Sequence, residues 1–516
     1  MTLGSTHAIA LAGLEGRLVE VEAHLSNALP GLIVSGLPDA ACRQAPERIR
    51  AAAESSGLPL PSRKIVVNLS PAALPKNGTG FDLAIAVAIL AAMEVIPHRH
   101  VREVVHLGEL GLDGAVRPVA GVLPSVVAAL RAGARDVVVP RANLAEASLI
   151  DGVRVHGIGS LKEIVLAYGE QGDPANWPIA PHLPGSGAGG RPVADLADVS
   201  GQAQARAALE VAAAGGHHLL LSGPPGSGKT MLAERMAGIL PPLDLASALE
   251  VLSIRSLLGT ASVSTGLDLT PPYVAPHHGA SLAAMIGGGS GIVRPGAVSA
   301  AHLGVLFLDE APQFKQDVLQ ALRQPLEAGA VTIARARSTV TFPARFQLVL
   351  AANPCPCGHG HGKAVRCTCT PMARRAYAAR LSGPVLDRID VQVHVPAVTR
   401  AASVAVAGEH TAPVAERVAR ARAAAAQRWR ALSGAPSGLT NGRVPGRVLR
   451  VGSFRLPPGI TADLDRALER GLLSLRGYDR TLRVAWTRAD LAGHTSPDAD
   501  DVGLALLLRA GTQQAA

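Results

Sequence analysis

The sequence predicts a multidomain α/β protein built around a parallel sheet. The chain has 516 residues, which is too long for one hydrophobic core and indicates about three domains. Strand-like and helix-like runs alternate along its first third, as in α/β domains. Near the middle, residues 218–237 follow the order of apolar strand, glycine-rich turn and helix.

The first 172 residues predict an α/β domain. Strands are expected over residues 18–23, 31–34, 64–69 and 136–140, and helices over residues 40–55, 82–93 and 123–132. A segment rich in proline and glycine follows at residues 173–194. It is interpreted either as an inter-domain linker or as an ordered strap across the next domain.

A phosphate-binding loop defines the next domain, residues 195–400. Its motif G-x-x-x-x-G-K-[ST] is made by Gly223, Pro224, Pro225, Gly226, Ser227, Gly228, Lys229 and Thr230. The amides of such a loop and the N-terminus of the next helix surround phosphates. Lys229 is expected to reach the β- and γ-phosphates, and the Thr230 hydroxyl to ligate Mg²⁺.

Two later strands are expected to end in polar groups of the same site. The apolar run 304–308 ends in Asp309 and Glu310. We expect Asp309 to hold Mg²⁺ through water, and Glu310 to orient and polarise the attacking water. The run 345–352 ends in Asn353, whose amide is expected to contact the γ-phosphate or that water.

Arg388 has two interpretations. In a ring it can reach the γ-phosphate of a neighbouring subunit, as an arginine finger does. Otherwise it is a surface arginine paired with Asp387 or Asp390.

Four of the five cysteines are clustered as two C-x-C pairs, Cys355 with Cys357 and Cys367 with Cys369. Four thiolates suit a tetrahedral, structural Zn²⁺. The alternative is a set of reduced thiols beside the site, and both interpretations remain open.

Residues 401–516 predict a helical lid, with helices expected over residues 413–432, 461–473 and 476–487.

The composition of the chain, with 48% hydrophobic and 17% charged residues, is typical of a folded globular protein. The net charge of +9 favours a polyanionic partner. The N-terminus lacks the basic region of a signal peptide, and the longest apolar run, residues 83–93, is too short to span a bilayer, so a cytoplasmic protein without membrane contact is expected.

The phosphate loop, the Asp309–Glu310 strand end, Asn353 and Arg388 together resemble an AAA+ ATPase of the magnesium-chelatase-like branch. Finer features resemble the ComM/YifB family: residues 275–278, 287–296, 321–327 and 353–358. The chain departs from that family at Ala297, where an acidic residue is usual, and at residues 311–313, where Leu-Pro-Glu is more common.

The first domain resembles the proteolytic domain of Lon-type proteases at residues 75–82, 108–110, 114–121 and 132–143. In that family a serine nucleophile and a lysine base stand at positions that here hold Gly80 and Leu123 to Ser125. A Ser–Lys dyad needs both groups, so the resemblance implies the fold without peptidase activity.

The ComM/YifB resemblance implies a hexameric ring that hydrolyses ATP and acts on DNA, as a helicase or branch-migration factor in natural transformation and homologous recombination. It also implies that an arginine of the lid covers the nucleotide; Arg476 matches that position best, and Arg483 is the alternative. The glycine-rich, flexible loop 287–296 with Arg294 and a hairpin over residues 329–342 with Arg335 and Arg337 would line the pore and contact phosphates without reading sequence. A solvated hairpin face is the alternative for these arginines.

Two other functions remain open for the chain: a magnesium-chelatase motor subunit, and a chaperone or regulatory ATPase acting on protein clients.

Overall fold

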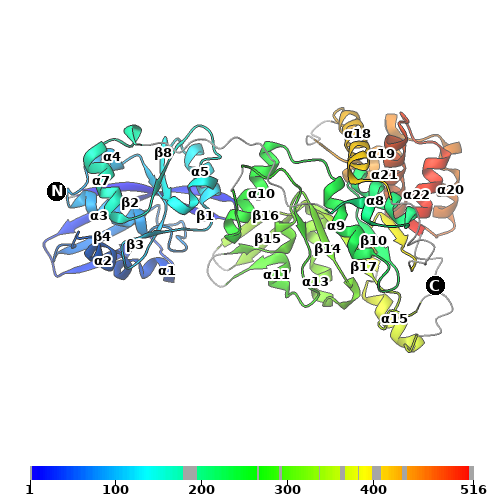
Figure 1. The fold of residues 1–516 in the computed structure, drawn as a ribbon, viewed down its shortest axis with the longest axis horizontal. Helices are drawn as coiled ribbons and strands as arrows, with labels where there is room; N and C mark the ends of the chain where they lie inside the picture. The colour runs from blue at the N-terminus through cyan, green and yellow to red at the C-terminus, as the bar shows by residue number, and fades with distance from the viewer. Residues whose placement is uncertain are drawn as a thin grey trace.

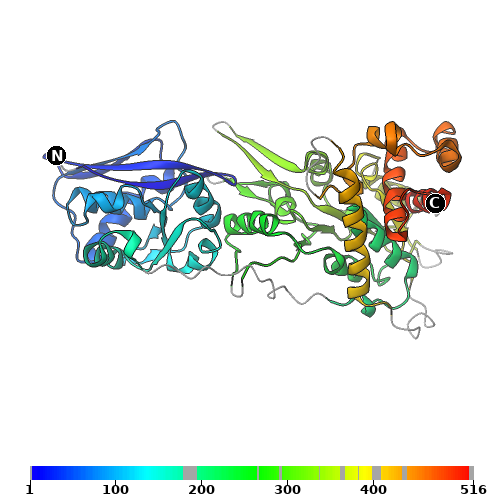
Figure 2. The same ribbon diagram turned by 90° about the horizontal axis from the view of Figure 1, so that it is seen from above.

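The computed structural model describes residues 3–177, 194–263, 266–289, 293–335, 338–360, 367–381, 383–397, 408–432 and 438–510. Most of the proposed linker, residues 178–193, lies outside these ranges. The molecule is elongated, with an N-terminal domain (3–177) at one end, a central domain (194–397) in the middle and a C-terminal helical domain (408–510) at the other end (Figure 1). The view from above shows the same order (Figure 2).

The N-terminal domain is built on a seven-stranded mixed sheet in the order β3-β4-β2-β1-β5-β8-β9. Its strands are β1 (Leu3–Ala12), β2 (Glu15–Ser26), β3 (Gly31–Ser35), β4 (Lys64–Ser70), β5 (Val105–His106), β8 (Asp136–Pro140) and β9 (Arg154–Ile158), with a separate pair β6 (Glu109–Leu110) and β7 (Val116–Arg117). β1 and β2 form a long antiparallel hairpin that turns at Gly13, whose φ is +69°. Such a conformation favours glycine.

Helices cover both faces of this sheet. They are α1 (Ala40–Arg43), α2 (Ala45–Ser55), α3 (Asp82–Ala92), α4 (His98–Val101), α5 (Val122–Arg131), α6 (Leu144–Ala147) and α7 (Leu161–Leu166). Ala8 and Ala10 of β1 share a core with α3, whereas Ile9 shares one with α5. Because side chains alternate along a strand, α3 and α5 lie on opposite faces. The helix expected over residues 40–55 is divided between α1 and α2, and Pro46 stands in the first turn of α2.

The central domain contains a five-stranded, wholly parallel sheet in the order β11-β14-β17-β10-β18. Its strands are β10 (Leu219–Ser222), β11 (Tyr273–Val274), β14 (Val305–Leu308), β17 (Gln347–Ala352) and β18 (Val391–His394). Its helices are α8 (Ala203–Gly215), α9 (Lys229–Ile239), α10 (Leu245–Leu258), α11 (Leu282–Ile286), α12 (Ala297–Ala300), α13 (Gln316–Ala321), α14 (Arg323–Ala328), α15 (Pro371–Arg380) and α16 (Gly383–Leu386). The carboxyl ends of β10, β14 and β17 meet at one edge, where ligands of open α/β sheets bind.

Two hairpins extend from the central domain: β12 (Gly287–Gly288) with β13 (Arg294–Pro295), and β15 (Ala330–Arg335) with β16 (Ser338–Pro343). The second hairpin extends towards the N-terminal domain (Figure 2). A Cβ at position 13 would lie 2.9 Å from Val340 Cγ1, so Val340 lies against the turn at Gly13. Helix α10 also packs on α5, and the Gly121 amide donates to the Ser256 carbonyl at 3.0 Å.

The C-terminal helices are α18 (Thr411–Trp429), α19 (Gly446–Arg450), α20 (Pro458–Glu469), α21 (Leu475–Ala492) and α22 (Ala499–Ala510). Trp429 and Trp486 are buried in one hydrophobic cluster that also contains Leu221 of β10 and Leu209 of α8. The helical domain is therefore docked on the sheet through a shared core. None of the helices in the described residues has an apolar stretch of the length needed to cross a bilayer.

Candidate nucleotide-binding site

The phosphate loop joins β10 to α9, which begins at Lys229. Gly226 and Gly228 have φ values of +73° and +92°, conformations that a side chain would strain. The Ser227 hydroxyl is buried, and it has no hydrogen-bond partner among the described residues. An open glycine-rich turn with an unsatisfied buried hydroxyl, at a helix N-terminus, fits the phosphates of a nucleotide.

Lys229 lies inside this loop. Its ammonium donates to the carbonyls of Gly223 and Pro224, both at 2.8 Å, and to Asn353 Oδ1 at 3.1 Å. Burial lowers the pKa of Lys229, and the nearby carboxylates of Asp309 and Glu310 act in the opposite direction. Phosphate oxygens can replace these neutral carbonyl acceptors because a charged acceptor makes a stronger hydrogen bond.

Asp309 and Glu310 follow β14, and Thr230 of the loop faces them. The Thr230 hydroxyl donates to Asp309 Oδ2 at 2.7 Å. A hydroxyl beside a carboxylate is an oxygen-donor set that suits Mg²⁺. Glu310 has a φ of +49°, an uncommon conformation for a residue other than glycine. Its carboxylate lies 3.8 Å from His278 Nδ1.

Asn353 follows β17, which lies between β14 and β10 in the sheet. Three strand ends, far apart in the sequence, thus bring Lys229, Asp309 and Asn353 to one edge. Lys229 can serve as a cation for phosphates, and Thr230 with Asp309 can serve as oxygen ligands for a metal. The neighbouring Glu310 carboxylate can accept a hydrogen bond from a water molecule.

Arg388 lies at the opposite edge of the sheet, because it precedes the amino end of β18. It forms an ion pair with Glu327, a partner that neither sequence interpretation proposed. Asp390 is instead held by Arg480, at 2.5 Å. Burial would raise the pKa of Asp390, but Arg480 and His217 outweigh it and keep this pKa well below its usual value.

Arg476 lies with Arg388, in a cavity of about 160 Å³ that is also lined by Glu327, Asp387, Asp479, Arg480 and Arg483. The resemblance implies that Arg476 covers a nucleotide, and in the structure Arg476 lies beside Arg388 and not beside the Lys229 of the same chain. Helix α21 packs against the segment before β18, where the Arg480 guanidinium donates to the Arg388 carbonyl at 3.0 Å. This contact sets the start of α21 at the edge away from the phosphate loop.

Two of the arginines expected to contact DNA, Arg294 and Arg335, lie in the two hairpins. Arg294 is exposed in β13, so the part of the predicted flexible loop that the structure describes is paired as a hairpin. Arg335 ends β15 and is half-buried. Arg337 lies outside the described residues.

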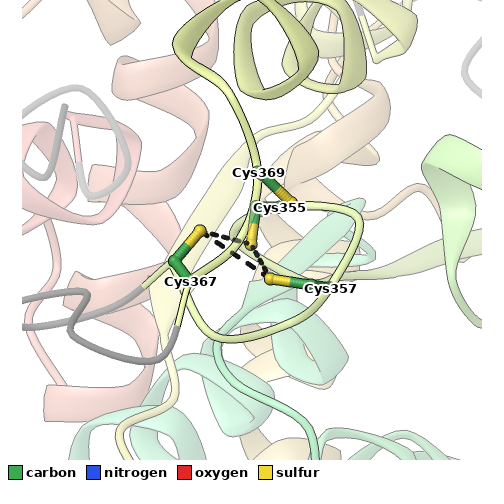
Figure 3. A group of neighbouring side chains, drawn as sticks. All are labelled: Cys355, Cys357, Cys367 and Cys369. Atoms are coloured by element: carbon green, nitrogen blue, oxygen red, sulfur yellow. Dashed lines mark hydrogen bonds between the residues drawn. The ribbon is translucent and has the colours of Figure 1, made fainter.

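The four cysteines lie together beside this site (Figure 3). The Cys355 sulfur is 3.4 Å from that of Cys357 and 3.7 Å from that of Cys367, and the Cys357 and Cys367 sulfurs are 3.7 Å apart. All four sulfurs lie within 4.8 Å of one another.

Two residues of the site were missed from the sequence. Gln202 precedes α8 with a φ of +55°, and its amide donates to the Ser227 carbonyl at 3.2 Å. His278 faces Glu310, as described above. Local pattern indicates neither contact, since each joins segments that are distant along the chain. The family resemblance marked residues 275–278 but gave His278 no role.

In the N-terminal domain, the positions of the Lon-type dyad hold groups that serve the fold. Gly80 lies just before α3. Leu123 of α5 is buried in the core, and the buried Ser125 hydroxyl of the same helix donates to the Gly121 carbonyl at 2.7 Å.

Comparison with known proteins relates the whole chain to one family. Residues 195–403 match magnesium chelatase, subunit ChlI; residues 21–143 match subunit ChlI of Mg-chelatase; and residues 408–509 match the ChlI C-terminal region. An uncharacterized protein of Mycobacterium tuberculosis is 50% identical over 511 residues, 99% of each chain.

Two further relatives cover nearly all of the chain. Uncharacterized protein YifB of Escherichia coli is 41% identical over 493 residues, 95% of this chain and 94% of its own. Competence protein ComM of Haemophilus influenzae is 39% identical over 502 residues, 96% of this chain and 94% of its own. Lon protease 2 of Bacillus subtilis is 32% identical over only 96 residues, 18% of this chain and 17% of the protease, in agreement with a Lon-like N-terminal domain. The chain therefore belongs to the ComM/YifB family of magnesium-chelatase-like AAA+ ATPases.

Proposed function

We propose that this protein is an ATP-hydrolysing ring motor that acts on DNA, as a helicase or branch-migration factor in natural transformation and homologous recombination. The observation that carries the ATPase part is the convergence of Lys229, Thr230, Asp309, Glu310 and Asn353 at one edge of the sheet. The DNA part is supported by the net charge of +9 and by the competence protein among its relatives. The proposed cofactors are ATP, Mg²⁺ and a structural Zn²⁺.

The residues of the site would divide the work of hydrolysis. When bound, ATP would supply the γ-phosphoryl group, and Mg²⁺ would neutralise the negative charge on its oxygens. Lys229 would leave the loop carbonyls for phosphate oxygens, while Thr230 and Asp309 would hold the metal. Glu310 would accept a proton from the attacking water, and Asn353 would keep Lys229 and that water aligned.

A ring is proposed because the arginines are separated from the phosphate loop. Arg388 and Arg476 lie at the amino edge of the sheet, where they are close to each other and away from their own Lys229. A head-to-tail interface that closes into a hexamer would place this edge against the nucleotide of the neighbouring subunit. There both arginines would stabilise the transferring charge.

In such a ring, Arg294 and the β15–β16 hairpin would face the pore, where Arg335 and Arg337 would contact DNA phosphates. Contacts of this kind bind without reading sequence. The N-terminal domain would serve as a binding or coupling domain without peptidase activity, because Gly80 and Leu123 to Ser125 stand at the positions of the serine and the lysine of the dyad.

Steady-state ATP hydrolysis by the purified chain, alone and with single-stranded, duplex and branched DNA, tests this proposal. Stimulation by single-stranded or branched DNA that a Lys229→Ala variant lacks is the expected result. Hydrolysis that depends on Lys229 and ignores every DNA would contradict the DNA function alone. Porphyrin metallation with partner subunits would indicate the chelatase function, and stimulation by a protein client would indicate the chaperone function.

A further inference from the structure

The four-cysteine group has the dimensions of a metal site. A tetrahedral Zn²⁺ with Zn–S bonds of about 2.3 Å holds its sulfurs about 3.8 Å apart. The three sulfur separations among Cys355, Cys357 and Cys367 are 3.4–3.7 Å, and Cys369 completes a set within 4.8 Å. A disulfide would need about 2.05 Å, and all four thiols are free.

Backbone amides support the same conclusion. The Gly360 amide donates to the Cys355 sulfur at 3.1 Å, and the amides of His359 and Thr368 lie against the Cys357 sulfur. Amides that point at sulfur stabilise negative charge there, which is the state in which cysteine binds zinc. Gly358 turns the chain back with a φ of +78°, and its amide donates to the Cys355 carbonyl at 3.0 Å.

We propose that Cys355, Cys357, Cys367 and Cys369 bind one structural Zn²⁺, and that this zinc knuckle fixes the phosphate loop and Asn353 for nucleotide binding. This inference rests on the proposed ATPase function of the neighbouring site. With four thiolates the ion has no open position for chemistry, so its role is to hold the chain.

The first link to the nucleotide site is a direct contact. Gly358 lies so close to Pro225 of the phosphate loop that a Cβ at position 358 would be 2.4 Å from Pro225 Cγ. The turn between Cys357 and Gly360 therefore supports one wall of the loop. Without a bound metal to hold the turn at residues 357–360, Pro225 of the phosphate loop would lose the residue that packs against it.

The second link is through the chain. Cys355 is two residues from Asn353, which accepts the hydrogen bond of Lys229. On the other side, Cys369 is followed by Thr370, whose side chain caps α15 by accepting from the Ala373 amide at 3.1 Å. Tyr377 of α15 lies beside the backbone of Asn353. The metal would thus join the end of β17 to α15 across Asn353.

Metal analysis and nucleotide binding test the proposal on the full chain. Wild type should contain about one zinc ion per chain, and both Cys367→Ala and Cys369→Ala should lose it. The same variants should bind a fluorescent ATP analogue roughly three- to tenfold more weakly. Cys42→Ala is the matched control, because Cys42 is a free cysteine buried in the N-terminal core; it should keep both zinc and affinity.

A second measurement needs no variant. The wild-type chain reloaded with Co²⁺ should show the visible and near-ultraviolet bands of a tetrahedral tetrathiolate site. Iron in place of zinc, zinc content that both variants retain, or an octahedral cobalt spectrum would overturn the metal assignment. Loss of zinc with unchanged analogue affinity would overturn the link to the phosphate loop. A chain that keeps its zinc and its affinity for the analogue but does not respond to DNA would contradict the proposed DNA function and leave this inference standing.

Discussion

A buried lysine occurs in each of the two α/β domains, and the two lysines have different surroundings. The Lys76 ammonium of the N-terminal domain is fully buried and donates to the Pro71 carbonyl. Lys229 also donates to main-chain carbonyls, but it adds the amide of Asn353 and lies near two carboxylates. Burial lowers the pKa of both ammonium groups. Burial of a lysine therefore does not by itself indicate a ligand-binding site. The polar residues at the ends of the neighbouring strands determine whether a ligand can bind.

The acidic residues differ in the same way. Asp82 is buried, and both its oxygens are held by Arg48, at 2.7 and 2.8 Å. Asp309 is only half-buried, and its two oxygens accept from neutral donors, the Thr230 hydroxyl at 2.7 Å and the Glu310 amide at 2.8 Å. A buried carboxylate that is neutralised by a guanidinium serves the fold, whereas a half-buried one that meets only neutral donors can still accept a metal.

The largest expected effect separates the two lysines. Lys229→Ala should lower ATP turnover by about 10³-fold, because the variant loses the cation that faces the transferring phosphoryl group. Lys76→Met should leave turnover per folded molecule near that of wild type. Steady-state hydrolysis, with folding checked by circular dichroism, measures both. A similar fall in the two variants would show that the lysines are not functionally distinct.

The buried ion pair of the N-terminal domain gives the next effect. Arg48→Met should lower the free energy of unfolding by about 3 kcal/mol, because Asp82 then keeps an uncompensated charge in the core. Replacing both partners by apolar residues, Arg48→Met with Asp82→Leu, should restore part of this loss. Chemical denaturation compares the two variants. Affinity for ATP should be unaffected in both, and equal destabilisation of the single and double variants would argue against the charge as the cause.

A pH dependence of stability follows from His106. Burial lowers its pKa to about 3, and its ring nitrogens contact Thr6 Oγ1 and the Tyr168 hydroxyl, each at 2.8 Å. The unfolded chain, with the ordinary pKa of 6.5, binds more protons between these two values, so stability is full above pH 6.5 and falls as the pH drops towards 3. From about pH 7 to about pH 5, His106 alone should remove about 2 kcal/mol.

A His106→Gln variant measures this contribution. Its free energy of unfolding should change less between the two pH values than that of wild type, by the amount assigned to His106. His218 of the central domain, whose pKa burial lowers to about 4, adds a dependence of the same sign that the variant retains. An unchanged pH slope in the variant would exclude His106 as the titrating group.

Local patterns were enough for the phosphate loop and for the two strand ends at Asp309 and Asn353. Each of these is an apolar run followed at once by a polar group, so neighbours in the sequence define it. The strand β1 was not expected, because Ser5, Thr6 and His7 look like a surface segment. Thr6 is buried nevertheless, and its hydroxyl donates to the Val101 and Val104 carbonyls.

The position of Arg476 depends on contacts that the sequence does not display. Helix α21 is placed by the ion pair of Arg480 with Asp390, which joins residues 90 positions apart. The contact of Gln202 with the phosphate loop also follows from tertiary packing. Motifs therefore predict which polar residue follows a strand. The packing of whole helices determines beside which edge of the sheet a residue of the C-terminal domain lies.

The smallest expected effect compares two side-chain amides. Asn353→Ala should lower ATP turnover about tenfold, or about 1.4 kcal/mol in activation free energy, because Lys229 loses the acceptor 3.1 Å away that holds it towards β17. Asn143 of the N-terminal domain is the matched amide. It accepts from the Val119 amide at 3.1 Å and donates to the Val119 carbonyl at 3.2 Å.

Asn143→Ala should lower the midpoint of thermal unfolding and leave turnover unchanged, since its hydrogen bonds to Val119 lie within the N-terminal domain. Single-turnover hydrolysis at saturating ATP separates the chemical step from binding for both variants. An equal loss of turnover would mean that Asn353 acts through general stability. A loss confined to Asn353→Ala would show that the acceptor of Lys229 is part of the chemical site.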